Sequence, residues 1–253
     1  MDALLNAHCP IYNFDYREPD LPMSLEAYVA TKQFVRSDTA TGIVKQAGNG
    51  DSVLHYFLFF ERDGGTVVDG KAFDAHPFDI EQVSVRVTKH GVVNAVYFYP
   101  HSAVESFAIT GTDLDKVLQE GHPIVYIAYG KHASYPVPYV SRYLMAGDEC
   151  LKPVRYDVKA VQASNAVMKS PGFGAILPLS RRIVRDLETI PVVPLALVST
   201  RMRFAVNDKS RTLMYVAIGV SGGVMLTVIA VLYVKRKRLY DAYKTLFGKH
   251  ITT

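Results

Sequence analysis

The stretch Val53–Glu61, VLHYFLFFE, is apolar and aromatic at almost every position. A run of this length and composition predicts a buried β-strand. It is followed by Asp63-Gly64-Gly65, a combination that is typical of a tight turn. The segments on either side of this strand are also rich in β-branched residues and Tyr, which favour strands over helices.

Three more strand patterns follow along the chain. Residues 80–88 alternate valines with polar side chains, and 92–99, VVNAVYFY, predicts their hairpin partner across the His90-Gly91 turn. Residues 123–129 predict a further strand. Strands at such short spacing predict a mainly β fold, with an antiparallel β-sandwich-like body and short helices.

Shorter elements are expected around this β core. Ser24 is a plausible N-cap for a helix at 24–34, and a second short helix is predicted at 180–188. Residues 195–206 have a strand-like pattern. We divide the chain into four parts, a β domain (1–150), an extension of the body with its linker (151–212), a membrane span (213–234) and a basic tail (235–253).

Leu213–Val234, LMYVAIGVSGGVMLTVIAVLYV, contains no charged residue over 22 positions. A helix of that length extends roughly 33 Å at about 1.5 Å per residue, which is enough to cross a bilayer core. Tyr215 and Tyr233 lie near its ends, where amphipathic rings favour the membrane interface. Helices buried in a soluble core rarely lack every charge over such a length, so we predict a single transmembrane helix.

The span and its tail also predict contacts. Gly219 and Gly223 have the GxxxG spacing that lets two spans pair closely. Four consecutive cations follow the span, namely Lys235, Arg236, Lys237 and Arg238. They favour anionic lipid headgroups, with non-specific contact to a nucleic acid as the alternative.

The composition indicates the kind of compartment in which the body folds. The chain of 253 residues has a formal net charge of +4, and much of its positive charge lies in the tail, so the body is close to neutral. Cys9 and Cys150 form neither a disulfide framework nor a metal-binding spacing. The N-terminus lacks the features of a signal peptide. We therefore expect a single-pass membrane protein whose body folds in a reducing compartment.

One segment of the body contains residues that can bind a metal ion or act as acid and base. In a strand, Asp79 and Glu81 project on the same side, and His76 precedes them. His132 and His101 each follow a predicted strand, and convergence of these strand ends would gather all five side chains. Such a set can hold a divalent cation or act as acid and base. The structural alternative is that the carboxylates pair with arginine and that the histidines are ordinary strand-end residues.

These residues also carry a resemblance. AHPFDIEQVSVRV and IVYIAYGKHASYP resemble the two motifs of the Vps62-like family, and the resemblance extends over roughly residues 10–145. The order H-x-x-D-x-E is similar to that of necrosis-inducing secreted proteins, which bind a divalent metal in a β-sandwich. The resemblance implies a metal at His76, Asp79 and Glu81, to which we add His132 as a candidate ligand.

Three functions follow as hypotheses. The chain is a structural protein that ties a larger shell to a membrane, a membrane-anchored trafficking adaptor of the Vps62 type, or a divalent-metal-dependent enzyme that uses His76, Asp79 and Glu81. Phe78 and Ile80 replace the Gly and Trp of the family motif, which favours the first. Our specific expectation is a minor capsid protein that links other capsid proteins to the inner membrane of a large icosahedral DNA virus, with no cofactor beyond a possible cation.

Overall fold

The computed structural model describes residues 2–30, 34, 36–68, 71–73, 75–100, 106–140, 148–163 and 187–201. Its helices are short: α1 (Asp2–Ala7), α2 (Leu25–Ala30), α3 (Leu114–Val117), α6 (Leu195–Arg201) and the 3-10 turns η2 (Gly111–Asp113) and η3 (Leu187–Thr189). The strands are β1 (Ile11–Asp15), β2 (Thr39–Gln46), β3 (Ser52–Asp63), β4 (Thr66–Val68), β5 (Lys71–Phe73), β6 (His76–Val87), β7 (Val93–Phe98), β8 (Phe107–Thr110), β9 (Leu118–Gln119), β10 (His122–Ile127), β11 (Ser134–Tyr135), β12 (Tyr139–Val140), β13 (Asp148–Glu149), β14 (Pro153–Tyr156) and β15 (Lys159–Gln162).

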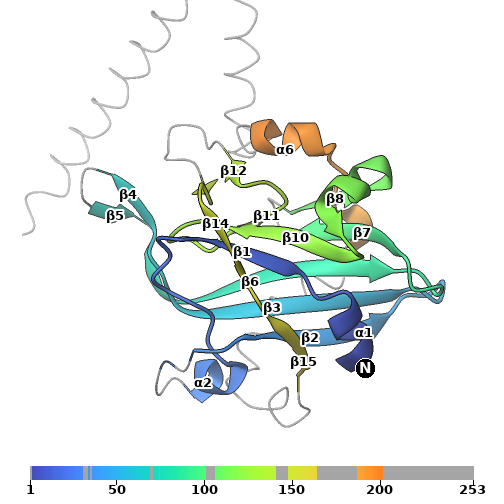
Figure 1. Ribbon diagram of the computed structural model, residues 1–253, viewed down its shortest axis with the longest axis horizontal. Helices are drawn as coiled ribbons and strands as arrows, with labels where there is room; N and C mark the ends of the chain where they lie inside the picture. The colour runs from blue at the N-terminus through green and yellow to red at the C-terminus, as the bar shows by residue number, and fades with distance from the viewer. Residues whose placement is uncertain are drawn as a thin grey trace, which may run out of the picture. The chain divides into compact units, whose positions relative to one another are not determined.

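Two sheets make up the body (Figure 1). The larger has six strands in the order β15-β2-β3-β6-β7-β8. The smaller has five, in the order β11-β10-β1-β14, with β9 paired to β10. Two short ribbons, β4-β5 and β12-β13, complete the described strands. The inner faces of the two sheets share one core, which confirms the mainly β fold and is consistent with a sandwich.

β3 is the strand predicted from the aromatic run, and it is buried from Val53 to Phe60 because both of its faces are covered. Its inner-face side chains, among them Phe60, join the core between the sheets, where the Phe60 ring lies 6.2 Å from that of Phe14 on β1. Its outer-face residues Phe57 and Phe59 pack with Met23 and α2. This two-sided burial explains why the sequence shows no apolar–polar alternation here.

The pairing of the strands is mixed, which corrects the expectation of an antiparallel body. β3, β6, β7 and β8 form antiparallel pairs, including the predicted β6–β7 hairpin. β1, however, runs parallel to β10, and β15 runs parallel to β2. Each parallel pair joins strands more than 100 residues apart in the sequence. No local turn pattern therefore indicates that these strands pair.

Two further predictions concern the C-terminal end of the described body. Residues 195–201, predicted as strand-like, form α6, and the Asp113 carboxylate accepts a hydrogen bond from the Leu195 N–H at 2.8 Å. That carboxylate satisfies an N–H at the start of the helix, a tertiary contact that local sequence does not reveal. Of the predicted helix at 180–188, the structure describes only the residues that enter η3.

None of the helices in the described parts of the chain combines the length and the apolarity that a bilayer crossing requires. The predicted span 213–234 and basic tail 235–253 lie outside the described residues. So do Gly219, Gly223 and the cations from Lys235 to Arg238.

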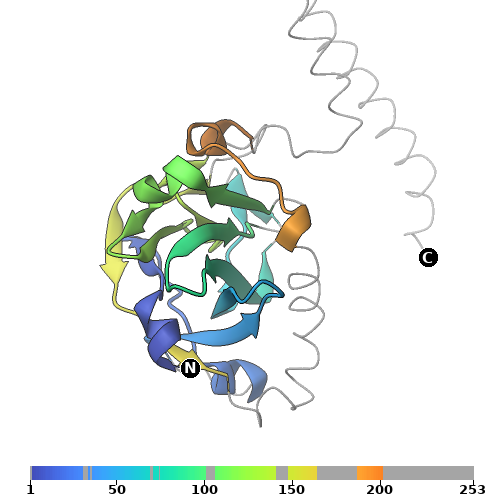
Figure 2. The same ribbon diagram turned by 90° about the vertical axis from the view of Figure 1, so that its right-hand side faces the viewer.

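The edge of the larger sheet is covered by the N-terminal helix (Figure 2). The Asn6 side-chain amide donates to the Ala160 carbonyl at 2.9 Å and accepts from the Ala160 N–H at 3.1 Å. One side chain therefore satisfies both backbone groups of an edge residue in β15, as a neighbouring strand would.

Two buried tyrosines in the core allow a matched test of how much the hydrogen bond of a buried hydroxyl contributes to stability. The Tyr56 hydroxyl donates to the Leu5 carbonyl at 2.9 Å, whereas the Tyr12 hydroxyl has no hydrogen-bond partner among the described residues. We expect Tyr56→Phe to lower the free energy of unfolding by about 1 kcal/mol or more, because it also leaves the Leu5 carbonyl unpaired. Tyr12→Phe removes an unpaired hydroxyl, so we expect no loss or a small gain. Thermal melting of the full chain in detergent, followed by circular dichroism, measures both, and equal destabilisation by the two variants would contradict the assignment.

Candidate functional site

The two motifs singled out in the sequence meet at one end of the sandwich. The register of β3 with β6 pairs Phe60 with Asp79 and Leu58 with Glu81. Because directly opposed residues project on the same side of a sheet, both carboxyl groups are placed on the inner face with Phe60 and Leu58. Phe78, which precedes Asp79, has φ 59°, in the left-handed region that favours glycine. The backbone at Phe78 therefore has a conformation that glycine adopts more readily than other residues.

A tight turn after β10 brings His132 to these carboxyls. The His132 N–H donates to the Ala128 carbonyl at 2.9 Å, and the turn contains positive φ values at Gly130 (70°) and His132 (56°). The imidazole lies flat on the Phe60 ring, with centroids 3.8 Å apart and an interplanar angle of 1°. His132 is fully buried there.

Both ring nitrogens of His132 face carboxylates. Nδ1 lies 3.1 Å from Asp79 Oδ2, and Nε2 lies 3.4 Å from Glu18 Oε1. Burial alone lowers the pKa of His132, but the hydrogen bonds to Asp79 and Glu18 outweigh it and raise the pKa to about 9. At neutral pH the group is therefore an imidazolium that donates a hydrogen bond to each carboxylate and stacks on an aromatic face.

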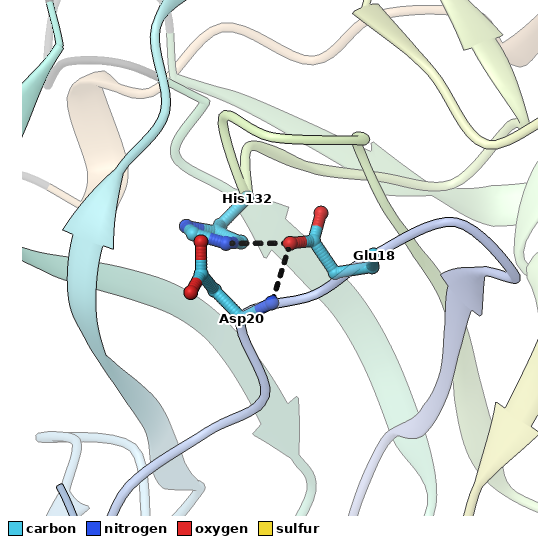
Figure 3. Close-up of side chains that lie close together, drawn as sticks. All are labelled: Glu18, Asp20 and His132. Carbon is cyan, nitrogen blue, oxygen red and sulfur yellow. Dashed lines mark hydrogen bonds and ion pairs between the residues drawn. The ribbon is translucent and has the colours of Figure 1, made fainter.

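Glu18 and Asp20 come from the loop that follows β1 (Figure 3). Glu18 is held in place by two backbone donors, since Oε2 accepts from the Gly130 N–H at 2.7 Å and Oε1 from the Asp20 N–H at 3.0 Å. The Asp20 carboxylate pairs with Arg62 on β3 at 2.8 Å. The cluster thus ties the N-terminal loop to β3, β6 and the turn after β10.

Glu81 lies deeper and has a different environment. Its Oε2 accepts a hydrogen bond from the Ser134 hydroxyl at 3.1 Å. Burial, and next the negative charge of Asp79, raise the pKa of Glu81 well above its usual range. A raised pKa favours the neutral form of the carboxyl, which binds a cation less well than a carboxylate does.

His76 belongs to a second group on the outer side of the site. Its Nε2 lies 3.7 Å from Asp63 Oδ2, and its side chain is 52% exposed. The pKa of Asp63 is raised, mainly by burial, although the Gly65 N–H bound to it acts in the opposite direction. Asp63, His76 and Asp79 present ligand atoms that all lie within 4.8 Å of one another.

These side chains fit a divalent cation by type. Glu18, Asp20 and His132 form one group with ligand atoms within 4.8 Å, and Asp63, His76 and Asp79 form the other. Carboxylate and imidazole donors suit Zn²⁺, Mn²⁺ and related ions. A cation at the first group must displace the proton from His132, whereas the second group uses an exposed histidine and is open to entry.

The sequence located part of this site. Asp79 and His132, predicted to be neighbours, are in contact. Glu81 is adjacent but turned to Ser134, His76 is grouped with Asp63, and His101 lies outside the described residues. Glu18, Asp20 and Asp63 were not predicted as site residues. Glu18 and Asp20 lie in an irregular loop and Asp63 ends β3, and spacing along the sequence connects none of them to residue 132.

Comparisons with known proteins assign no family. No protein-family model and no curated protein matches the chain. A solved structure described as "Toxin fold for microbial attack and plant defense" is similar at a TM-score of 0.42 and 12% identity, over 63% of this chain and 72% of that one. It agrees loosely with the resemblance to necrosis-inducing proteins, and at this level it carries no conclusion about function. The Vps62-like resemblance stays a prediction.

The raised pKa of His132 predicts an alkaline loss of stability. Its value is about 9 in the folded chain and about 6.5 when unfolded, so the folded state holds the proton more tightly. This contribution, on the order of 3 kcal/mol, is complete below pH 6.5 and is lost as the pH rises through 9. We expect the melting temperature of the full chain to fall over that range.

The matched variant for this measurement is His132→Gln, which cannot titrate, and we expect a flatter pH profile for it. His90→Gln, at an exposed turn, serves as the control and keeps the profile of the unmodified chain. Identical profiles for His132→Gln and the unmodified chain would show that His132 is not held as an imidazolium.

Proposed function

We propose that this chain is a structural protein that a single span anchors to a membrane, with the β body as a tethered module. The observation that carries the proposal is the uncharged run of 22 residues at Leu213–Val234, followed at once by four cations. The run has the length of a bilayer crossing, and the cations favour the anionic headgroups beside it.

The chemistry of the body supports a structural role over a catalytic one. Both nitrogens of His132 are occupied by carboxylates, so the imidazole offers no free base. Glu81 is buried with a raised pKa and accepts from Ser134. Ionisable groups that satisfy one another hold segments together, whereas a general base needs an accessible lone pair within reach of substrate.

The specific form of the proposal is a minor capsid protein of a large icosahedral DNA virus. In this role the body packs against other capsid proteins, and the span enters the inner membrane of the virion. Span pairing through Gly219 and Gly223 and contact of the tail with the genome are parts of the same proposal. The Vps62-like resemblance and the tethered architecture support it, and a trafficking adaptor is the alternative with the same architecture.

Membrane anchoring is tested by alkaline extraction. We expect the full chain to stay with the membrane pellet in carbonate and to enter the supernatant only with detergent. Val224→Arg combined with Leu226→Arg places two charges at the centre of the run, each costing about 2.5–3.5 kcal/mol on insertion, and we expect release without detergent. The control pair Leu239→Arg and Leu246→Arg lies in the tail and leaves the pellet fraction unchanged. Release of the unmodified chain would refute the anchor.

Particle association separates the two structural roles. A capsid protein co-purifies with particles from the cells that make the chain and leaves them only with detergent. Localisation to vacuolar or endosomal membranes, with no particle-bound fraction, would contradict the capsid role and favour the adaptor.

Cation binding is a second candidate function, favoured by the convergence of Asp63, His76 and Asp79. We expect Mn²⁺ or Zn²⁺ to raise the melting temperature of the chelator-treated full chain, because a ligand of the folded state stabilises it by about 2.7 kcal/mol at one hundred times its Kd. His76→Gln removes an exposed ligand and abolishes the rise.

The control for this titration is His90→Gln, which also removes an exposed histidine but leaves the proposed ligands in place. A rise of the same size in both variants would assign the effect to another site. No rise with any divalent cation would leave the cluster as an arrangement of ion pairs alone.

A further inference from the structure

Exposed apolar and basic side chains gather where β1 ends and β14 begins. We call this surface the Tyr16 patch, and it consists of Tyr16, Arg17, Tyr129, Leu151 and Lys152. Tyr16, Leu151 and Tyr129 are 57%, 56% and 40% exposed. Large apolar side chains that cluster on a surface indicate a contact site more than scattered ones do.

Direct contacts hold these residues in one surface. The Arg17 guanidinium lies 4.4 Å from the centre of the Tyr129 ring and 6.0 Å from that of Tyr16. The Lys152 ammonium lies 4.8 Å from the centre of the Tyr16 ring, and the Tyr16 N–H donates to the Lys152 carbonyl at 3.0 Å. The Leu151 N–H donates to the Asp15 carboxylate at 2.9 Å, which anchors the backbone of Leu151 to the end of β1.

The charges of the patch leave one cation available. Arg17 is paired with Asp15 at 2.7 Å and with Glu149 at 2.9 Å. Lys152 forms no ion pair with any described carboxylate, and it stands beside an exposed tyrosine ring. Tyrosine with an unpaired lysine is the combination that favours a membrane interface with anionic headgroups.

The last described element of the body lies near the patch. α6, the last described element, packs against β12, and β12 pairs with β13. Glu149 of β13 binds Arg17 of the patch through its carboxylate and the Tyr129 N–H through its carbonyl, at 2.8 Å. The last described residues therefore lie next to the element that supports the patch.

The connection to the span is short. Only residues 202–212 separate α6 from Leu213. Even fully extended, these residues reach no more than about 40 Å, at roughly 3.5 Å each. They include Arg203, Lys209 and Arg211 against Asp208 alone, so the segment beside the bilayer is also basic.

We propose that the Tyr16 patch rests on the surface of the bilayer that the span enters, with Tyr16, Tyr129 and Leu151 in the interface and Lys152 on anionic headgroups. This inference depends on the membrane anchor proposed above and adds an orientation to it. The short tether raises the local concentration of the bilayer at the patch, so a small contact area suffices.

The test uses the full chain inserted in vesicles of phosphatidylcholine with a minority of phosphatidylserine. Leu151→Cys places a thiol in the patch for an environment-sensitive fluorophore. Gly48→Cys is the matched control, because an added Cβ there meets nothing within 4 Å and the β2–β3 turn lies at the opposite end of β3 from the Gly64–Gly130 contact beside the patch. The native cysteines Cys9 and Cys150 are buried, so labelling is selective.

We expect lipids that carry a spin label near the headgroup to quench the probe at position 151 several-fold more than the probe at 48. Lys152→Glu reduces the quenching at 151, whereas Lys89→Glu, an exposed lysine at the far end, does not. Equal quenching at 151 and 48 in chains that float with the vesicles overturns the orientation alone, the result expected when a protein partner covers the patch. Failure of the chain to float overturns the anchor and the orientation together.

Discussion

The register between β3 and β6 is the constraint on which the site depends, because it turns two carboxyl groups toward the core of the sandwich. Asp79 and Glu81 occupy inner-face positions that valines hold further along the same strand. Buried carboxyls are tolerated only when they are paired or neutral. The chain places an imidazolium against Asp79, and it gives Glu81 a hydroxyl donor from Ser134 in a buried setting that raises the pKa of that carboxyl. Both contacts fasten the segment after β10 to the sheet, and the loop after β1 joins them through Glu18, whose Oε1 lies 3.4 Å from His132 Nε2.

The parts of the fold that are local in sequence were predictable, and the parts that join distant segments were not. The apolar run at 53–61 and the hairpin at 80–99 became β3, β6 and β7 because burial and turn formation leave a pattern within a few residues. The parallel pair of β1 with β10 leaves none, since its register is set by the shared core. α6 likewise depends on Asp113, some eighty residues earlier.

The same distinction applies to the site. Asp79 and His132 were selected because each follows or belongs to a recognisable strand motif, and they are in contact. Glu18 and Asp20 lie in an irregular loop, where a carboxylate has no periodicity to mark it as inward-facing. The hydrogen bond from the Gly130 N–H to Glu18 shows what selects that carboxylate, namely a backbone donor in a turn more than 100 residues away.

The Asn6 side chain that satisfies both backbone groups of Ala160 has a consequence for self-association. Without α1, the outer strand of the larger sheet would present free donors and acceptors, a surface that recruits strands from other molecules. An N-terminal helix of six residues thus acts as a shield against intermolecular β-pairing. When copies of the chain meet, such a shield keeps their larger sheets from merging into a continuous one.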